Sequence, residues 1–281
     1  MRKVPLAGPQ YNPAPVSVTI AELHVYPVKG LRAIRVARAR LTRRGLEHDR
    51  RFMVVDAGGT FLTQRGHPSL ATVWTDITGG ELRLAAPDRD EIAVSLEPTG
   101  GEALEVRVWE SRCRALAPSP AADAWLSAFL GLDCRLVYMP EATERPVDPR
   151  FAGPGHHVGF ADGYPVLVAS TASLADLNAR LAKPVPMNRF RPNVVLSGAP
   201  AYAEDGWREI RSGSARLRLA KPCQRCQVTT IDQATGEVRS AEPLATLSAY
   251  RATADCTNRF GMNAVVLETG LVEEGATVAI S

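Results

Sequence analysis

The sequence lacks several features that define common classes of protein. No apolar stretch approaches the roughly 20 residues that a helix needs to cross a bilayer. Residues 1–15 contain several prolines but no apolar core of a secretory signal, and we expect them to form a loose tail. The formal net charge of +3 is too small to indicate nucleic acid or an anionic membrane surface as a partner. We therefore expect a cytoplasmic protein with no nucleic acid and no membrane among its partners.

Cysteine is sparse as well. Cys113, Cys134 and Cys256 stand alone, so no second close pair completes the ligand set of a structural zinc site or of an iron–sulfur centre. An odd number of scattered cysteines is typical of a reducing compartment. The glycine-rich run at 153–159 does not match a dinucleotide-binding loop, because no helix is predicted after it and its glycine spacing differs. The sequence gives no sign of a nicotinamide or iron–sulfur site.

The two remaining cysteines form the most informative motif. Residues 221–232 read KPCQRCQVTTID, with Cys223 and Cys226 on either side of Arg225. A guanidinium beside a thiol favours the thiolate, which can bind a soft metal or attack an electrophile. Residues 227–232 alternate like a strand, which predicts that Cys226 lies at the start of a strand. The motif alone does not decide between two interpretations, a functional thiolate and two cysteines with a structural role only.

Short strands separated by glycine-containing turns dominate the first half of the chain. Alternating or β-rich patterns predict strands at 16–20, 23–28, 51–56, 60–64, 73–77, 81–85, 91–96 and 104–109. Turn signals with paired glycines lie at 57–59, 78–80 and 98–101. This spacing favours a small barrel or sandwich over alternating strands and helices.

Two segments have the pattern of amphipathic helices. Ser119 can cap a helix that Pro120 begins and Gly131 ends. Residues 171–182 place leucines at helical spacing, with a proline just beyond. Between these helices, residues 140–154 are rich in proline and charge and are the best candidate for a linker or mobile loop. A length of 281 residues suits about two domains.

Three further motifs accompany the cysteine pair. They are YPVKG at 26–30, GLEHDRRF at 45–52 and NRFRPN at 188–193. Together the four motifs closely resemble the MOSC family, named for the C-terminal domain of molybdenum cofactor sulfurase. The similarity runs from about Val18 to the C-terminus. It is greatest for the branch with an added N-terminal barrel domain, which includes the mitochondrial amidoxime-reducing component and bacterial proteins that confer resistance to N-hydroxylated base analogues.

This resemblance implies a fold and a domain organisation. The expected fold is mainly β with a few helices (α+β), built from an N-terminal β-barrel-like domain and an MOSC β-barrel domain. The boundaries that we expect are a flexible tail at 1–15, the MOSC N-terminal domain at 16–139, a linker or loop at 140–155, and the MOSC domain at 156–281.

The resemblance also implies a molybdenum cofactor, in which molybdenum is bound to molybdopterin. Cys226 matches the cysteine that binds molybdenum and is the expected catalytic residue, whereas Cys223 would lie behind it or serve packing alone. A high-valent molybdenum held by sulfur needs such a soft thiolate ligand. Lys29, Arg51 and Arg191 match positions near the cofactor's phosphate and pterin, and ammonium and guanidinium groups suit a dianionic phosphate.

Some of these positions are ambiguous or depart from the family pattern. Arg50 is the rival of its neighbour Arg51, and Asn193 suits a pterin edge but also a turn at a strand start. Gly30 and Gln224 stand where amidoxime-reducing relatives have serines, and backbone contacts at 163–164 would replace the hydroxyl groups of a Thr-Ser pair. The full set of expected cofactor-binding residues is Lys29, Gly30, Arg50, Arg51, Gly163, Tyr164, Arg191, Asn193, Gln224, Arg225 and Asn263.

The function that follows is the reduction of an N-oxygenated small molecule, such as a hydroxylamine or amidoxime. Electrons would come from a separate ferredoxin, haem or flavin protein. The alternative is a sulfur-carrier or cofactor-handling protein, in which Cys226 forms a persulfide or passes the cofactor on. The N-terminal domain favours the enzyme, because it would contribute Lys29 and Arg51 to a closed site. A purely structural homologue is disfavoured by the complete set of cysteine, lysine and arginine residues.

Overall fold

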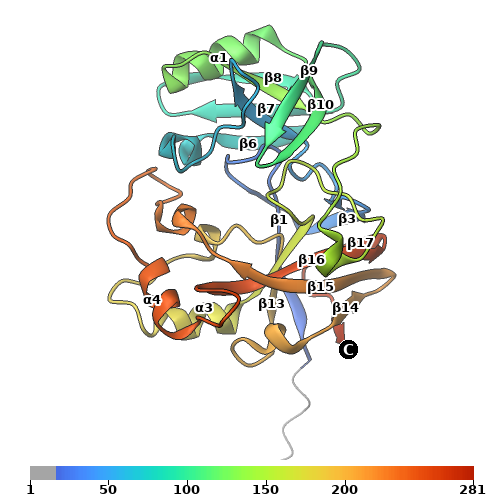
Figure 1. Ribbon diagram of the computed structural model, residues 1–281, viewed down its shortest axis with the longest axis vertical. Helices are drawn as coiled ribbons and strands as arrows, with labels where there is room; N and C mark the ends of the chain where they lie inside the picture. Colours follow the sequence, from blue (N-terminus) through green and yellow to red (C-terminus); the bar gives the residue numbers. More distant parts are fainter. Residues whose placement is uncertain (1–16) are drawn as a thin grey trace, which may run out of the picture.

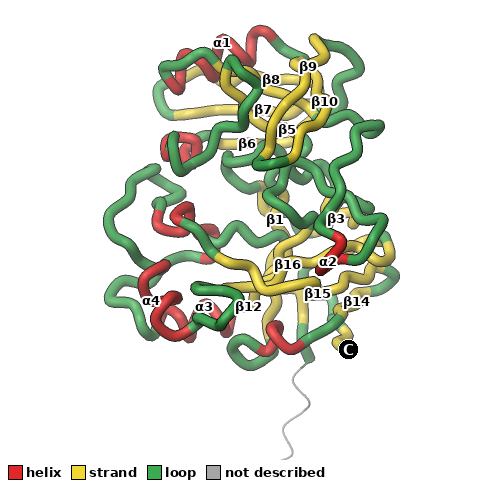
Figure 2. Tube along the Cα trace, viewed as in Figure 1, coloured by secondary structure: helices red, strands yellow, loops and turns green. Residues whose placement is uncertain are grey.

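The computed structural model describes residues 17–281, so the tail expected at 1–15 lies outside the described residues. Figure 1 shows two β-rich bodies stacked along the long axis of the molecule. The upper body is built mainly from residues 52–138, and the lower body combines the start of the described chain with its C-terminal half. Loops dominate the junction between the two bodies (Figure 2).

An eight-stranded sheet forms the centre of the lower body. Its strands are, in spatial order, β18 (Ala279–Ile280), β14 (Glu209–Ser212), β15 (Ala215–Gln224), β16 (Arg259–Glu268), β12 (Val166–Ser170), β13 (Val194–Ser197), β1 (Thr19–Val25) and β2 (Ile34–Arg35). Neighbouring strands are antiparallel except β12 and β13, which are parallel. Leu23, Val168, Leu196 and Ala264, from four of these strands, are completely buried in one apolar core.

The first strands of the chain therefore complete the sheet of its C-terminal half. The same is true of a smaller sheet, in which β17 (Gly270–Glu273) pairs with β3 (Arg38–Thr42) and β3 pairs with β4 (Gly45–Leu46). Three helices, α2 (Pro149–Ala152), α3 (Thr171–Asn178) and α4 (Leu244–Tyr250), also belong to the C-terminal half. Because of these pairings, the lower body needs both ends of the described chain in order to bury its core.

The upper body contains two antiparallel sheets and one helix. One sheet has the order β5 (Phe52–Asp56), β11 (Cys134–Tyr138), β10 (Ser111–Ala117) and β9 (Glu102–Val108). The other has the order β6 (Trp74–Thr78), β7 (Glu81–Ala86) and β8 (Arg89–Ser95). The helix α1 (Pro120–Leu130) packs against them, and Phe52, Leu82, Leu126 and Leu136 are completely buried in the shared core.

The predicted mainly β fold with a few helices is confirmed. The helix at α1 has the bounds that its capping residues predicted, since the Ser119 hydroxyl accepts a hydrogen bond from the Ala122 N–H at 3.2 Å. Gly131 ends it with a φ of 71°, a conformation that suits glycine. The hairpin predicted around 78–80 is the β6–β7 pair. Among the described residues the strand pairing gives four open sheets, however, and none of them closes into a barrel.

Several local predictions were wrong. The helix expected at 171–182 ends at Asn178, and residues 60–64 make only isolated bridges. The strands on either side of the turn signal at 98–101, β8 and β9, lie in different sheets. Residues 140–155, expected as a linker or loop, form an irregular segment with the short α2, and its buried Arg145 donates to the carbonyls of Gly159 and Asp162 at 2.9 Å each. Arg145 thereby fixes the shape of the loop at 159–162.

The strand predicted at 227–232 is also absent. Residues Gln227–Thr230 form a 3-10 helix (η4), which follows directly after Cys226. The hydroxyl of Thr229 donates to the carbonyl of Cys226 at 3.0 Å, and that of Thr230 donates to the carbonyl of Gln227 at 2.8 Å. Such hydrogen bonds from threonine to the backbone three residues earlier compete with strand formation. Cys226 therefore lies just beyond the end of β15 rather than at the start of a strand.

The remaining short helices of the described chain are η1 (Pro68–Thr72), η2 (Met187–Arg189) and η3 (Ala203–Gly206). Within residues 17–281, every helix is too short or too polar to span a lipid bilayer. The η3 helix carries Glu204, which is completely buried and accepts a hydrogen bond from the Ser173 hydroxyl at 2.6 Å. Its second oxygen, Oε2, has no partner among the described residues.

We predict that Glu204→Gln increases stability at neutral and higher pH. Burial raises the pKa of the Glu204 carboxyl, although Ser173 opposes this effect. Folding therefore favours the protonated acid, so the stability of the wild type is highest below the ordinary carboxyl pKa and declines as the pH rises through the folded-state pKa. The neutral amide removes this decline, which corresponds to roughly 1–3 kcal/mol for a poorly satisfied buried group. Urea unfolding at several pH values measures the difference in unfolding free energy between the wild type and Glu204→Gln. Glu144→Gln is the control, because Glu144 is exposed. A pH-independent difference between wild type and Glu204→Gln would contradict the assignment.

Candidate functional site

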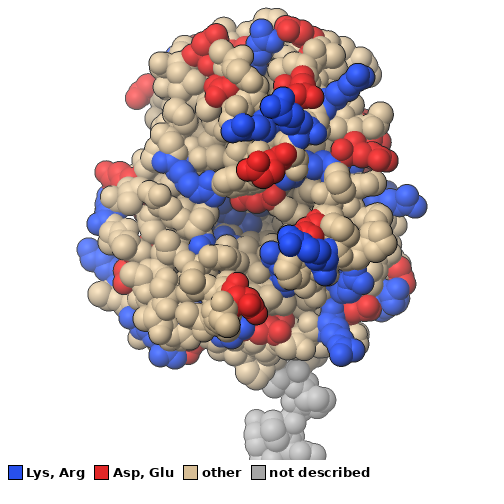
Figure 3. Space-filling model, in the orientation of Figure 1, with Lys and Arg blue, Asp and Glu red and all other residues tan. Residues whose placement is uncertain are grey.

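A cavity lies between the two bodies and is lined from both. The space within it that water-sized molecules can occupy is about 150 Å³, and the cavity opens to solvent at its mouth. Its walls come from the loop after β1, residues 62–65, Trp109, residues 161–164, residues 190–193, and the end of β15 with the start of η4. The space-filling view shows a hollow at this junction with basic residues inside it (Figure 3).

The cavity is lined by more positive than negative charge. Lys29, Arg50, Arg65, Arg191 and Arg225 line it, and Asp162 is the one carboxylate among the lining residues. A low-dielectric cavity with several cationic groups and few anions to balance them favours an anionic ligand. Arginine forks in particular match the geometry of phosphate oxygens. The electrostatics therefore point to a ligand with more than one negative charge.

Two of these arginines are held against one aromatic ring. The guanidinium carbons of Arg50 and Arg191 lie 4.1 and 4.3 Å from the ring centre of Tyr26. Tyr26 is buried, which raises the pKa of its hydroxyl to about 12, and the hydroxyl donates to the carbonyl of Pro192 at 3.2 Å. Burial also lowers the pKa of Arg191 to about 10, so the side chain still stays charged at neutral pH. The ring thus fixes two cations on the same wall.

The backbone at these arginines is unusual. Arg50 has a φ of 46° and Arg191 a φ of 54°, in the left-handed region that is uncommon for residues other than glycine. Such conformations persist only where the surrounding structure enforces them, and they occur often at binding sites. The left-handed conformation of Arg50 is held by hydrogen bonds from its guanidinium to Asp49 at 2.7 Å and to Asn193 at 3.0 Å.

Asn193 uses its whole amide within the protein. Its oxygen accepts from Arg50 at 3.0 Å and from the Leu167 N–H at 3.1 Å. Its amide nitrogen donates to the His24 carbonyl at 3.1 Å and to Asp49 at 2.9 Å. With every donor and acceptor occupied, Asn193 is placed to position Arg50 rather than to bind a pterin edge directly.

Lys29 and Asp162 form an ion pair in the cavity wall. Lys29 is 8% exposed, and its ammonium group contacts the Asp162 carboxylate. Burial lowers the pKa of Lys29, and the charge of Asp162 opposes this shift. For Asp162, the surrounding protein opposes ionisation, but Lys29 and the Trp109 indole hold its pKa below the usual value. The Trp109 N–H donates to Asp162 Oδ1 at 3.1 Å. Asp162 is therefore a fixed carboxylate facing the cavity.

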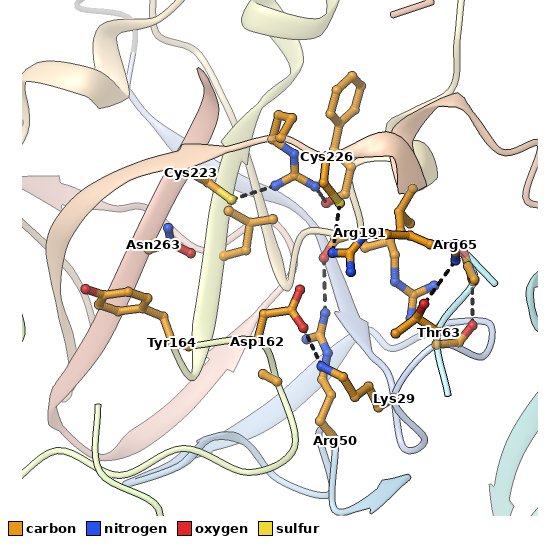
Figure 4. Close-up of a pocket in the computed structure, with 18 of the residues that line it drawn as sticks. Lys29, Arg50, Thr63, Arg65, Asp162, Tyr164, Arg191, Cys223, Cys226 and Asn263 are labelled. Atoms are coloured by element: carbon orange, nitrogen blue, oxygen red, sulfur yellow. Dashed lines mark hydrogen bonds and ion pairs between the residues drawn. The ribbon is translucent and has the colours of Figure 1, made fainter. Parts of the chain in front are cut away.

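Both thiols of the cysteine pair face the cavity, but they have different partners. Arg225 Nη1 contacts the sulfur of Cys223 at 2.8 Å, and its Nη2 donates to the Phe190 carbonyl at 2.7 Å. Burial raises the pKa of Cys223, against the effect of Arg225. The sulfur of Cys226 lies 3.5 Å from Arg65 Nη2. Figure 4 shows the two thiols on the side of the cavity opposite the Lys29–Asp162 pair.

The structure brings together ten of the twelve residues that the sequence nominated, and two lie elsewhere. Arg51 points away from the cavity, with Nη2 donating to the Met139 carbonyl at 2.6 Å and Nη1 to Glu141 at 3.0 Å. Gln224 is exposed and contacts Thr257 at 3.3 Å. Arg50 ends a turn with a left-handed backbone just before β5, so the direction of its side chain depends on a turn geometry that the sequence pattern did not show. The structure favours Arg50.

Among the lining residues that the sequence did not nominate, three carry a charge or a large aromatic ring: Arg65, Trp109 and Asp162. Arg65 and Trp109 lie in the N-terminal half, outside all four motifs, and only the three-dimensional fold brings them to the cysteines. Asp162 precedes the nominated Gly163, but nothing in the local pattern distinguishes it from a loop aspartate. The guanidinium of Arg65 stacks 4.6 Å from the centre of the Trp109 ring, which links these two residues.

The chemistry of the donor set limits how a metal could be held. Within residues 17–281, no group of three or more histidine, cysteine, aspartate or glutamate side chains could hold a metal ion. A metal in this cavity would therefore need ligands from an accompanying molecule in addition to a cysteine. A Cβ at Gly163 would meet no atom within 4 Å, so the backbone there is open to a ligand. The cavity suits an anionic ligand that approaches the two thiols from its open mouth.

Comparison with known proteins relates the chain to named families. Residues 17–133 match the MOSC N-terminal beta barrel domain, and residues 155–279 match the MOSC domain. Mitochondrial amidoxime-reducing component 1 of Homo sapiens is 35% identical over 243 residues, covering 83% of this chain and 72% of the relative. Mitochondrial amidoxime reducing component 2 of Homo sapiens is 32% identical with the same coverage of 83% and 72%. The crystal structure of YiiM from Geobacillus stearothermophilus overlaps 42% of this chain and 54% of its own, with 20% identity and a TM-score of 0.32, too low to show a shared fold.

We predict that the protein binds pyrophosphate and that Lys29 contributes to this binding. A ligand that binds only the folded state raises the melting temperature, by about 2–4 °C for each kcal/mol in a chain of this size. Lys29→Met keeps the apolar stem and removes the charge, and it should reduce this increase by at least half. Thermal melts with pyrophosphate, compared with sodium chloride at equal ionic strength, measure the effect.

Lys183→Met is the matched control, because Lys183 is exposed and does not line the cavity. It should behave like the wild type. An equal pyrophosphate effect in wild type and Lys29→Met would show that the cavity cations do not form an anion site.

Proposed function

This chain belongs to the MOSC family, and from that premise we propose that it is a molybdenum-cofactor-dependent oxidoreductase that reduces N-oxygenated small molecules. The substrates would be of the hydroxylamine or amidoxime type, in keeping with relatives that are named amidoxime-reducing components. The observation that carries the proposal is a single cavity that combines two cysteine thiols with five cationic side chains. A metal bound through a pterin with a phosphate group would use a thiolate as its ligand and cations around the phosphate.

The residues present fit such a cofactor. Lys29, Arg50 and Arg191 would hold its phosphate and pterin, and the open backbone at Gly163 would allow close approach. When bound, the cofactor supplies the two-electron chemistry that removes an oxygen atom from nitrogen. The protein's contribution is binding, orientation and electrostatics. The cationic wall would stabilise the anionic cofactor, and the ion pair of Lys29 and Asp162 forms part of the same lining.

Cys226 is the better candidate for the metal ligand. The sulfur of Cys223 is engaged by Arg225 at 2.8 Å, and burial disfavours its thiolate. Cys226 is partly buried, as Cys223 is, but it lies two residues beyond the end of β15 and has only one long contact, to Arg65. A ligand that must bind an incoming metal needs a free lone pair and access to the cavity, and Cys226 has both.

The electron source and cellular location are part of the same proposal. The chain has no glycine pattern for binding a dinucleotide, so we propose a separate ferredoxin, haem or flavin protein as the electron donor. All five cysteines lie within the described residues and are free, as is usual in a reducing compartment. This supports the expectation of a cytoplasmic protein, which stays a prediction.

We predict that Cys226→Ser lowers the molybdenum content of the purified protein by at least about tenfold, because it removes the protein's metal ligand. Cys223→Ser should retain most of the metal. Elemental analysis together with pterin fluorescence measures both, on protein whose folding is confirmed by its melting curve. If Cys223→Ser lost the molybdenum and Cys226→Ser kept it, Cys223 rather than Cys226 would be the metal ligand. A persulfide on Cys226 in metal-free wild-type protein would instead favour the sulfur-carrier alternative.

We also predict that reduction of benzamidoxime depends on an added electron donor. NADH or NADPH alone should give no turnover, whereas a reduced viologen dye should drive it, since a small dye can reach the cavity without a specific docking surface. The amount of benzamidine formed measures the reaction, with Cys226→Ser as the inactive control. Turnover with the nicotinamide alone would contradict the requirement for a partner.

A further inference from the structure

Trp109 occupies a position that ordinarily suits glycine. It follows β9 directly, and the pairing of Val108 with Ser111 leaves a two-residue loop formed by Trp109 and Glu110. Its φ of 54° lies in the left-handed region, where a bulky side chain is strained. In two-residue hairpin loops, positive φ at the first position is usually supplied by glycine, asparagine or aspartate. A tryptophan here is therefore unfavourable for the turn itself.

The surroundings hold the indole in one place at the mouth of the cavity. The Phe61 ring meets it edge-on with centroids 4.9 Å apart, and the Arg65 guanidinium lies 4.6 Å from its centre. Its N–H reaches across the junction to Asp162 at 3.1 Å. The indole still lines the cavity and is 38% exposed. Strain that is maintained by three independent contacts at a binding site indicates a functional requirement.

Asp162 presents its second oxygen beside this indole. Oδ1 accepts from both Lys29 and Trp109, while Oδ2 has no hydrogen bond within the described part of the chain. The Asp162 side chain is 65% exposed because it faces the open cavity. An aromatic surface and a fixed acceptor thus lie side by side on the cavity wall. Together they match a flat, conjugated group that carries N–H or O–H donors.

We propose that Trp109 determines substrate specificity by selecting flat, conjugated N-oxygenated compounds over puckered aliphatic ones. The inference rests on the proposed reductase function and assigns Trp109 a role in the substrate specificity of that reaction. A planar substrate stacks on the indole and donates hydrogen bonds to Asp162 Oδ2, whereas a puckered ring makes fewer contacts with the same surface. Aromatic stacking of this kind corresponds to an affinity difference of up to about tenfold.

The test compares two ligands that differ only in the shape of one ring. Benzamidoxime and cyclohexanecarboxamidoxime share the same N-oxygenated head group and have similar size. Dissociation constants are measured by calorimetry on the protein as isolated, without an electron donor, so that no turnover is needed. The wild type should bind the flat ligand about 5–10 times more tightly.

Three variants distinguish the role of the indole from a general effect on folding. Trp109→Gly removes the ring and suits the left-handed backbone, so we expect it to fold and to lose the preference for the flat ligand. Trp109→Phe keeps an aromatic surface and should retain most of the preference. Trp74→Phe is the control, because Trp74 is 59% exposed and does not line the cavity. The same preference in Trp109→Gly as in the wild type would overturn the proposal.

Turnover separates this proposal from the function on which it rests. In the dye-driven assay, Trp109→Gly should raise KM for benzamidoxime more than it lowers kcat, since the residue acts on binding. A protein that shows the ligand preference but contains no molybdenum would contradict the proposed reductase while supporting the role of Trp109. A reductase whose Trp109→Gly variant discriminates as well as the wild type would leave the function intact and exclude the specificity role.

Discussion

The structure depends on keeping several like charges close together around one cavity. Lys29, Arg50, Arg65, Arg191 and Arg225 share this space, and their repulsion opposes the closed arrangement of the two bodies. The protein offsets that repulsion locally: Asp162 pairs with Lys29, and Asp49 pairs with Arg50. The ring of Tyr26 stabilises two of the arginines through its π-electrons. The charge that remains unbalanced is what an anionic cofactor would neutralise.

This arrangement explains why the chain needs two bodies and an unusual order of strands. Residues Thr19–Val25 pair with the sheet of the C-terminal half, and Lys29, shortly after this strand, lines the cavity. The upper body then contributes Arg65 and Trp109 from above. The Trp109–Asp162 and Lys29–Asp162 contacts connect loops far apart in sequence. An anion bound in this cavity would therefore be physically coupled to interdomain packing, because the same side chains would serve both.

Local chemistry accounts for what the sequence could predict. The bounds of α1 were predictable because a capping serine, an N-terminal proline and a left-handed glycine act within a few residues. The structure at 227–230 was not, because two threonine hydroxyls bind the backbone and replace the expected strand with a turn. Motif similarity brought Cys226, Lys29 and Arg191 together correctly in space. It could not separate Arg50 from Arg51, and it missed Arg65, Trp109 and Asp162, because their proximity arises only from tertiary packing.

The central claim is that Cys226 completes the sulfur coordination of a molybdenum cofactor in this cavity. X-ray absorption at the molybdenum K-edge, on wild-type protein purified without chelators, tests it directly. The account predicts a molybdenum signal whose sulfur shell contains one ligand more than the pterin dithiolene supplies, and Cys226→Ser protein reloaded with cofactor should lose that one ligand. The absence of molybdenum from wild-type protein purified from a cofactor-producing host, or a sulfur shell that is the same in wild type and Cys226→Ser, would contradict it.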